Sequence, residues 1–247
     1  MSDDSVTHCP ECETEHSLNT MNCIKILDYA VNQAELNKAL FFEGYDKDAT
    51  EFIATGAKQG YIFYLITDIE GSQALQKEDA DRYGGYLKFL QQKAWPNSIR
   101  RALRRRLLMF GRGDCIVYAF IDIEDAVNVL LTLRDQLIPI PDLRISAHLI
   151  RLSIGLTDRK HFKLNMESKW DFNVSAVTDA FRISTIKPKS WESLDKSKYK
   201  IKFAIVGDAY AALKSRGITS LAGIEDEISG APKHGIEYRE KCLAGGI

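Results

Sequence analysis

Residues 61–66 constrain the fold of this chain more than any other feature. They read Tyr-Ile-Phe-Tyr-Leu-Ile, an unbroken run of aromatic and aliphatic residues. A run of this length and type predicts a β-strand that is buried on both faces of a sheet. Because Gly56 and Gly60 interrupt the chain just before it, we predict that one main domain covers residues 59–247 and that residues 1–58 form a separate extension.

The rest of the main domain alternates between helical spacing and strand-like runs. Strands at residues 107–110 and 116–120 flank Gly111-Arg-Gly-Asp114, as the arms of a β-hairpin flank its turn. Hairpin-linked strands interleaved with helices predict an α+β fold with a mixed, largely antiparallel sheet, and they disfavour a doubly wound nucleotide-binding fold. The remaining predicted elements are helices at 72–93 (ending near Pro96), 123–137, 175–186 and 209–214, strands at 144–156 and 201–206, and two short closing strands around 230–235.

The composition excludes several classes of protein. The chain has 247 residues, of which 45% are hydrophobic and 27% charged, so it can bury a sizeable core and is not disordered. Its 33 basic and 34 acidic residues nearly cancel, which leaves no general attraction for nucleic acid or for anionic membranes. An arginine-rich run at 100–112 lacks the aromatic interleaving of a nucleic-acid site, and we interpret it as a solvated face or a triphosphate contact in a dimer groove.

The sequence also predicts where the protein works. Its N-terminus is acidic and polar, unlike a signal peptide, and no run reaches the roughly 18 apolar residues of a membrane helix. The five cysteines are odd in number and do not resemble a disulfide framework. We therefore predict a cytoplasmic protein without a membrane span.

Four residues of the extension have side chains of the kinds that bind zinc. Cys9, Cys12, His16 and Cys23 follow the pattern C-x2-C-x3-H-x6-C, which lacks a second CxxC and the spacing of a standard zinc finger. We predict a small knuckle followed by a helix here, and zinc binding stays open. A zinc-dependent nucleic-acid adaptor is a hypothesis that depends on this cluster alone.

Two aspartates come at the ends of predicted buried strands. Asp68 follows the strand that starts at residue 61, and Asp114 lies in the hairpin turn. Two carboxylates on adjacent strands would form a hard-oxygen site for Mg²⁺ or Mn²⁺, which bind one or two protein carboxylates together with phosphates. The alternative is that each is an ordinary turn aspartate, because aspartate is common in turns.

Three segments together resemble the class III nucleotide cyclase catalytic domain. They are Ile66-Thr-Asp-Ile-Glu-Gly-Ser72, Phe110-Gly-Arg-Gly-Asp114 and Arg151-Leu-Ser-Ile-Gly155. The resemblance covers roughly residues 60–240 and implies a ferredoxin-like α+β core that works as a head-to-tail homodimer. It further implies that two divalent ions, Mn²⁺ or Mg²⁺, bind to Asp68, to Asp114 and to the backbone carbonyl of Ile69.

The resemblance also implies how the triphosphate and the transition state are bound. The backbone amides of Glu70, Gly71, Ser72 and Gln73 correspond to those that hold the triphosphate, and Lys233 is a loose match to the family's triphosphate lysine. The family's transition-state arginine corresponds to Arg182. Its ribose-orienting asparagine is replaced by Thr178, so that either this threonine or Asn173 would orient the ribose. A solvated helix charge is the alternative interpretation of Arg182.

The base-selecting positions depart most from the purine-specific members of the family. Phe110 stands where those members have a lysine, and Asp171 where they have an aspartate. Phenylalanine offers no hydrogen bond and occupies space that a two-ring base would need, so a one-ring base fits better. Asp171 can accept from uracil N3–H or from the cytosine amino group, or it can simply cap the following helix.

The chain is therefore most similar to the pyrimidine cyclases of bacterial anti-phage Pycsar systems. This resemblance implies synthesis of cyclic UMP from UTP as a second messenger for a cyclic-nucleotide-binding effector. A cytidylate cyclase that makes cyclic CMP and a catalytically silent nucleotide sensor on the same fold are the alternatives.

Overall fold

The computed structural model describes residues 6–9, 14–17, 55–56, 58–100, 107–112, 114–153, 175–230 and 237–247. The strands of its main sheet are β3 (Tyr61–Ile69), β4 (Leu107–Arg112), β5 (Cys115–Phe120), β6 (Ile145–Ser153), β7 (Ile201–Val206), β8 (Ile224–Gly230) and β9 (Tyr238–Gly246). The helices are α3 (Ser72–Glu78), α4 (Ala80–Phe89), α5 (Trp95–Arg100), α6 (Ile123–Leu137), α8 (Ser175–Ser184) and α9 (Gly207–Ser215). Short 3₁₀ turns at Lys189–Ser193 and Lys196–Lys198 lead from α8 into β7.

The strand order identifies the architecture. In the described residues the main sheet has seven strands in the order β4-β5-β3-β6-β7-β9-β8. Strand β3 is antiparallel to both β5 and β6, whereas β6 and β7 are parallel. The path from β3 through α3–α5 to the β4–β5 hairpin, and through α6 to β6, is the β-α-β-β-α-β path of a ferredoxin-like unit. The predicted α+β fold with a mixed, largely antiparallel sheet is therefore confirmed.

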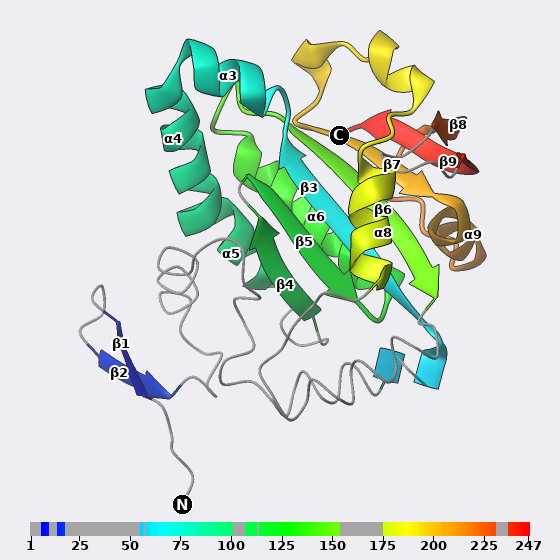
Figure 1. Cartoon of the computed structure of the whole chain (residues 1–247), viewed down its shortest axis with the longest axis horizontal. Coiled ribbons are helices and arrows are strands. Elements are labelled where there is room, and N and C mark those ends of the chain that lie inside the picture. Colours follow the sequence, from blue (N-terminus) through cyan, green and yellow to red (C-terminus); the bar gives the residue numbers. More distant parts are fainter. Residues whose placement is uncertain are drawn as a thin grey trace, which may run out of the picture.

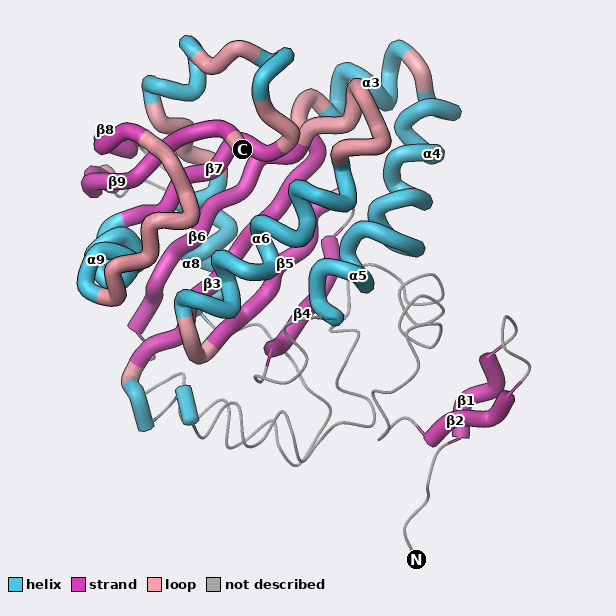
Figure 2. Tube along the Cα trace, turned by 180° about the vertical axis from the view of Figure 1, so that it is seen from behind, coloured by secondary structure: helices cyan, strands magenta, loops and turns pink. Residues whose placement is uncertain are grey.

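Helices cover both faces of this sheet. Helix α6 packs against β3 and β5, and α9 packs against β6, β7 and β9. Helix α8 lies on the opposite face, against β3 and β6, as Figures 1 and 2 show from the two sides. This arrangement puts both faces of the central strands out of water.

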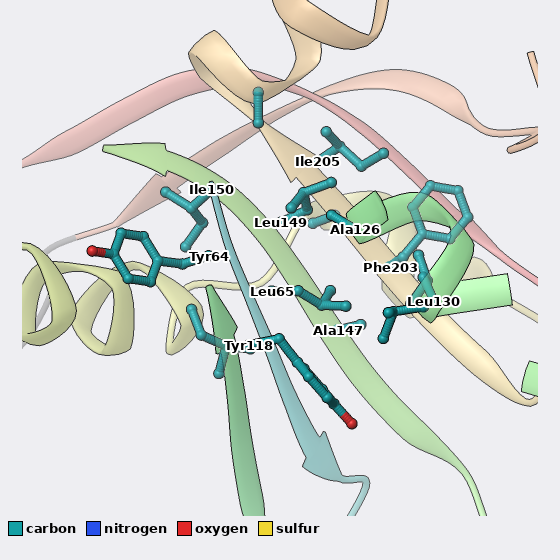
Figure 3. Packing of buried hydrophobic residues seen from close by; sticks show 14 of the residues in the cluster. Tyr64, Leu65, Tyr118, Ala126, Leu130, Ala147, Leu149, Ile150, Phe203 and Ile205 are labelled. Atoms are coloured by element: carbon teal, nitrogen blue, oxygen red, sulfur yellow. The ribbon is translucent and has the colours of Figure 1, made fainter. Parts of the chain in front are cut away.

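The core forms between the sheet and α6. Leu65 of β3, Leu130 of α6 and Phe203 of β7 are almost completely buried and lie close together in Figure 3. The buried positions of α6 recur at three- and four-residue intervals, which is the pattern that predicted the helix. The burial of these apolar side chains is the main force that holds the sheet in place.

The predicted helical stop near Pro96 is wrong. The segment after β3 divides at Asp79, whose side chain accepts a hydrogen bond from the backbone N–H of Arg82 and so caps α4. A π-turn over Leu90–Ala94 then leads into α5, which continues through Pro96. A π-turn changes the hydrogen-bond register of the helix, so the missing N–H of a proline is tolerated at the junction.

The other boundaries differ less from the predictions. The closing strands β8 and β9 are longer than predicted and flank residues 231–236, which lie outside the description. In the extension, β1 (Val6–Cys9) and β2 (Thr14–Ser17) pair antiparallel, with Cys9 opposite Thr14. The predicted helix of the extension, like Cys12 and Cys23, lies outside the described residues, and the predicted domain boundary is not tested. No helix in the described part of the chain has both the length and the apolar character needed to cross a bilayer.

Candidate active site

The two aspartates predicted from the sequence come together at one end of the sheet. Asp68 is the next-to-last residue of β3 and lies opposite Cys115, the first residue of β5. Asp114 immediately precedes Cys115, in the turn of the β4–β5 hairpin. The antiparallel pairing of β3 with β5 therefore brings the two carboxylates side by side.

Burial and mutual repulsion dominate the electrostatics of the two carboxylates. The Oδ2 atom of Asp114 is buried without a hydrogen-bond partner in the described residues. Burial, and then the charge of Asp114 and a hydrogen bond to it, raise the pKa of Asp68 to about 7, against weaker opposing effects from the Ile69 backbone and from Lys187. A proton shared between the carboxyl groups, or a bound cation, would relieve this repulsion.

The residues present fit a divalent cation. Carboxylate oxygens are hard ligands of the kind that Mg²⁺ and Mn²⁺ prefer. No group of three or more His, Cys, Asp or Glu side chains gathers here or elsewhere in the described residues. Further ligands would then come from backbone carbonyls, phosphates and water, which is the usual environment of Mg²⁺ in phosphate-processing sites.

A pocket of about 450 Å³ opens beside Asp68. It lies between the end of β3, the C-terminal half of α8 and the start of β7, and it is large enough for a nucleotide-sized ligand. Its lining residues are Ile66, Asp68, Ile69, Glu70, Gly71, Cys115, Ser146, His148, Phe181, Ser184, Thr185, Lys187, Trp191 and Lys202.

The turn after β3 forms one wall of this pocket. Gly71 takes a left-handed conformation with φ of 72°, which glycine adopts without strain, and its carbonyl accepts from the N–H of Leu75 to start α3. The N–H of Glu70 donates to the carbonyl of Arg144 at 3.0 Å. This amide is therefore used by the sheet in the structure described here, which leaves Gly71, Ser72 and Gln73 as the predicted phosphate-binding amides.

Helix α8 faces the pocket with one side only. Phe181, Ser184 and Thr185 line the cavity, whereas Arg182 is exposed and forms an ion pair with Asp179 at 3.0 Å. Successive helical residues are rotated by about 100°, so Arg182 lies at the flank of the face that lines the pocket, on the side of Asp179. Thr178 lies one turn earlier on the same helix, as its spacing predicts.

The remaining predicted site residues are not brought to this pocket by described contacts. Asp171, Asn173 and Lys233 lie outside the described residues, and the backbone of Phe110 pairs with Val117 in the hairpin. Arg151, which belongs to the third segment of the resemblance and is not itself a predicted site residue, is at the far end of β6.

The register fixes the position of this arginine. Arg151 is opposite Phe63, five residues before Asp68 on β3. There it pairs with Asp208 at 2.7 Å and lies over the ring of Tyr61.

Sequence reasoning missed three groups near the aspartates. Lys187 lines the pocket and lowers the pKa of Asp68, although other influences outweigh it. The pKa of Tyr83 on α4 is raised by burial and by the charges of Asp114 and Asp68, which indicates that α4 approaches the pair. The third group is the buried ion pair between Glu70 and Lys202. These residues carry no local motif that could have identified them.

Comparisons with known proteins show the fold. No protein-family model matches the chain, and no curated protein is similar to it in sequence. Among solved structures it is similar to an adenylate/guanylate cyclase/hydrolase from Silicibacter pomeroyi, with a TM-score of 0.52 and 12% sequence identity, over 76% of this chain and 97% of that one. The chain therefore has a cyclase-like α+β fold, and at this identity the likeness shows the fold alone.

Proposed function

We propose that this protein is a nucleotide cyclase that converts UTP to 3′,5′-cyclic UMP and pyrophosphate. The single observation that carries the proposal is the pair of Asp68 and Asp114, which share one partly buried site beside a nucleotide-sized pocket. Two carboxylates that approach so closely without a cation are unfavourable, and such an arrangement is typical of functional sites. A likeness in fold to a solved cyclase supports the same class of reaction.

The reaction needs one bond to form and one to break. The ribose 3′-oxygen attacks the α-phosphorus, the bond from that phosphorus to the β-phosphate oxygen breaks, pyrophosphate leaves, and the hydroxyl proton passes to water. Asp68, Asp114 and the Ile69 carbonyl would hold two divalent cations, which when bound would acidify the 3′-hydroxyl and neutralise the triphosphate. The amides of Gly71, Ser72 and Gln73 would orient the phosphates.

Arg182 would supply positive charge for the transition state. It is exposed on α8 and is not among the described lining residues of the pocket of its own chain, which favours an arrangement in which it serves the site of a second copy. Thr178, on the same helix, would orient the ribose. A homodimer with two shared sites is thus part of the proposal.

Phe110 and Asp171 are the basis for a pyrimidine substrate. A phenylalanine in the lysine position leaves no donor for a purine ring, and an aspartate accepts equally from uracil or cytosine. We further propose that the cyclic product serves as a second messenger in anti-phage defence and acts through a separate effector protein. CTP is the alternative substrate.

The deciding experiment offers the purified protein each of the four nucleoside triphosphates with Mn²⁺, and identifies the products by mass spectrometry. Cyclic UMP from UTP is the expected result, and Asp68→Asn and Asp114→Asn are matched controls that should make none. If cyclic CMP is formed from CTP instead, the substrate in the proposal becomes CTP. A purine product would overturn the role of Phe110.

Two observations favour a second function, a nucleotide sensor without catalysis. Arg182 forms an ion pair with Asp179, and Thr178 stands where the resemblance implies an asparagine. Nucleotide binding without any product from the four substrates would establish the sensor. Retention of both aspartates argues against it, because binding alone does not need a site for two metals.

A further inference from the structure

A buried ion pair lines the same pocket as Asp68. The ammonium group of Lys202 is 2.8 Å from Oε1 of Glu70, and the two side chains are only 11% and 17% exposed. The Tyr199 hydroxyl donates to Oε2 of the same carboxylate at 3.2 Å. Charges are seldom buried to this degree, because each loses its hydration, so a buried pair calls for an explanation.

The sheet places Lys202 in one row with Asp68. Asp68 lies opposite Ser146 on β6, and Ser146 lies opposite Lys202 on β7. Residues that face one another across neighbouring strands project from the same face, so the side chains of Asp68 and Lys202 share one side of the sheet. Both line the same pocket.

Lys202 is itself held rigidly. Its ammonium lies 5.1 Å from the ring centroid of Trp191, and the indole Nε1 of that tryptophan donates to the carbonyl of Phe203 at 3.1 Å. The ring of His148 also lies beside Trp191, with centroids 5.0 Å apart. An ammonium fixed in this way can fix its partner in turn.

Glu70 connects Lys202 to the turn that carries the candidate site. It follows Ile69 and precedes Gly71, so it links the end of β3, with Asp68, to the start of α3. Its N–H donates to the carbonyl of Arg144, which anchors only the backbone on the β6 side. The contacts of its carboxylate with Lys202 of β7 and with Tyr199, just before β7, add a second anchor.

We propose that Lys202 is a positioning residue which, through Glu70, fixes the turn between β3 and α3 in the conformation that binds metal and phosphate. The inference rests on the proposed function for its catalytic consequence, but not for its structural one. If Lys202 loses its charge, the Glu70 carboxylate is left buried with the Tyr199 hydroxyl but without a counter-ion, and it moves toward water and takes the turn with it. Groups that orient metal ligands typically contribute 10–100-fold to metal affinity or activity.

The test uses the variant Lys202→Met, in which a long side chain remains over Trp191 but the positive charge is removed. The matched control is Lys214→Met. Lys214 forms an ion pair with Glu225 outside the pocket, and the side chains of the two residues are 59% and 61% exposed, respectively. In the metal-free protein, amide hydrogen exchange of a peptide that spans residues 66–75 should be at least about tenfold faster in Lys202→Met and unchanged in the control. Mn²⁺ titrated by electron paramagnetic resonance should bind roughly tenfold more weakly to Lys202→Met.

Further variants separate positioning from a general loss of stability. Lys202→Arg retains a cation and should restore Mn²⁺ affinity and the KM for nucleotide to within about threefold of wild type. If Lys202→Met does not fold, Glu70→Gln replaces it in the same measurements. Unchanged exchange of residues 66–75 together with unchanged Mn²⁺ affinity in a folded variant would overturn the proposal. Absence of any cyclic product from wild type would overturn the proposed function instead, because the exchange measurement needs neither metal nor turnover.

Discussion

Asp114 is a residue at which the proposed function and stability oppose each other. Its Oδ2 is buried without a partner, and its charge is one cause of the raised pKa of Asp68. Asp114→Asn should stabilise the metal-free protein by about 1 kcal/mol, because an amide donates to Asp68 where a carboxylate repels it. The same change should lower activity by more than about 100-fold, since it removes a metal ligand.

Thermal unfolding in a chelator and turnover with Mn²⁺ measure the two effects. Asp142→Asn is the control, because the Asp142 side chain is 65% exposed where it pairs with Arg82. Full activity of Asp114→Asn would rule out the metal site. A lower melting temperature in chelator would show that the two carboxylates do not repel each other.

His148 makes stability depend on pH. It is fully buried, its Nε2–H donates to the carbonyl of Ile186 at 2.8 Å, and burial, with the nearby Lys202 and Lys187, lowers its pKa from 6.5 to about 4. Between these values the unfolded chain binds a proton that the folded protein does not, so the free energy of unfolding decreases as the pH falls. Protonation of this one histidine in the unfolded chain should lower the free energy of unfolding by about 2 to 3 kcal/mol between pH 7 and pH 4.5.

Urea unfolding of wild type and His148→Gln at both pH values tests this effect. Glutamine can donate to the same carbonyl but does not titrate, so the loss of stability on acidification should be smaller by that amount. Asp68 titrates with the opposite sign in metal-free protein and is present in both chains, so its effect cancels. Equal losses in the two proteins would contradict the assignment.

At the scale of elements, sequence predicts local features well and tertiary junctions poorly. The β4–β5 hairpin follows from two apolar runs around Gly111-Arg-Gly-Asp114, and α6 follows from its spacing. The division at Asp79 was missed, because a capping aspartate inside a helical pattern resembles a solvated residue. The residues of the candidate site fall into the same two groups, those found from a local motif and those brought together only by tertiary contacts.

Asp68 and Asp114 could be found in the sequence because each ends a local motif. Glu70 and Lys202 are joined only by the order of strands in the sheet, which no local pattern specifies. Arg151 shows that a residue in a segment that resembles the family's need not belong to the site, because the register places it away from the aspartates. Groups that act through tertiary contacts could not have been predicted from spacing.

Helix α8 is the element whose role is easiest to test. Arg182→Ala should lower kcat by roughly 100-fold with little change in KM, because the guanidinium would act on charge that develops only in the transition state. Asp179→Ala, which removes its partner on the helix surface, should change kcat by less than about threefold. Steady-state kinetics with Mn²⁺ and UTP measures both variants. Equal kcat in Arg182→Ala and wild type would mean that α8 does not serve catalysis.

At the scale of the whole molecule, the question is whether one chain contains a complete site. The pocket beside Asp68 is lined by Phe181, Ser184 and Thr185 of α8, and Arg182 is not among its described lining residues. If the arginine reaches the pocket of a second copy, each site of a homodimer takes its aspartates from one chain and its arginine from the other. This arrangement predicts complementation between two inactive variants.

Asp68→Ala and Arg182→Ala homodimers should each be nearly inactive, yet a mixture whose subunits exchange should regain activity. A mixed dimer has one site with both defects and one with neither. Random pairing makes about half of the dimers mixed, and each has one of its two sites intact, so activity should return to roughly a quarter of wild type. Differently tagged chains, analysed by native mass spectrometry, verify that exchange is complete. If fully exchanged mixtures remain inactive, each protomer must hold its own complete site, and Arg182 must turn from Asp179 toward the pocket of its own chain.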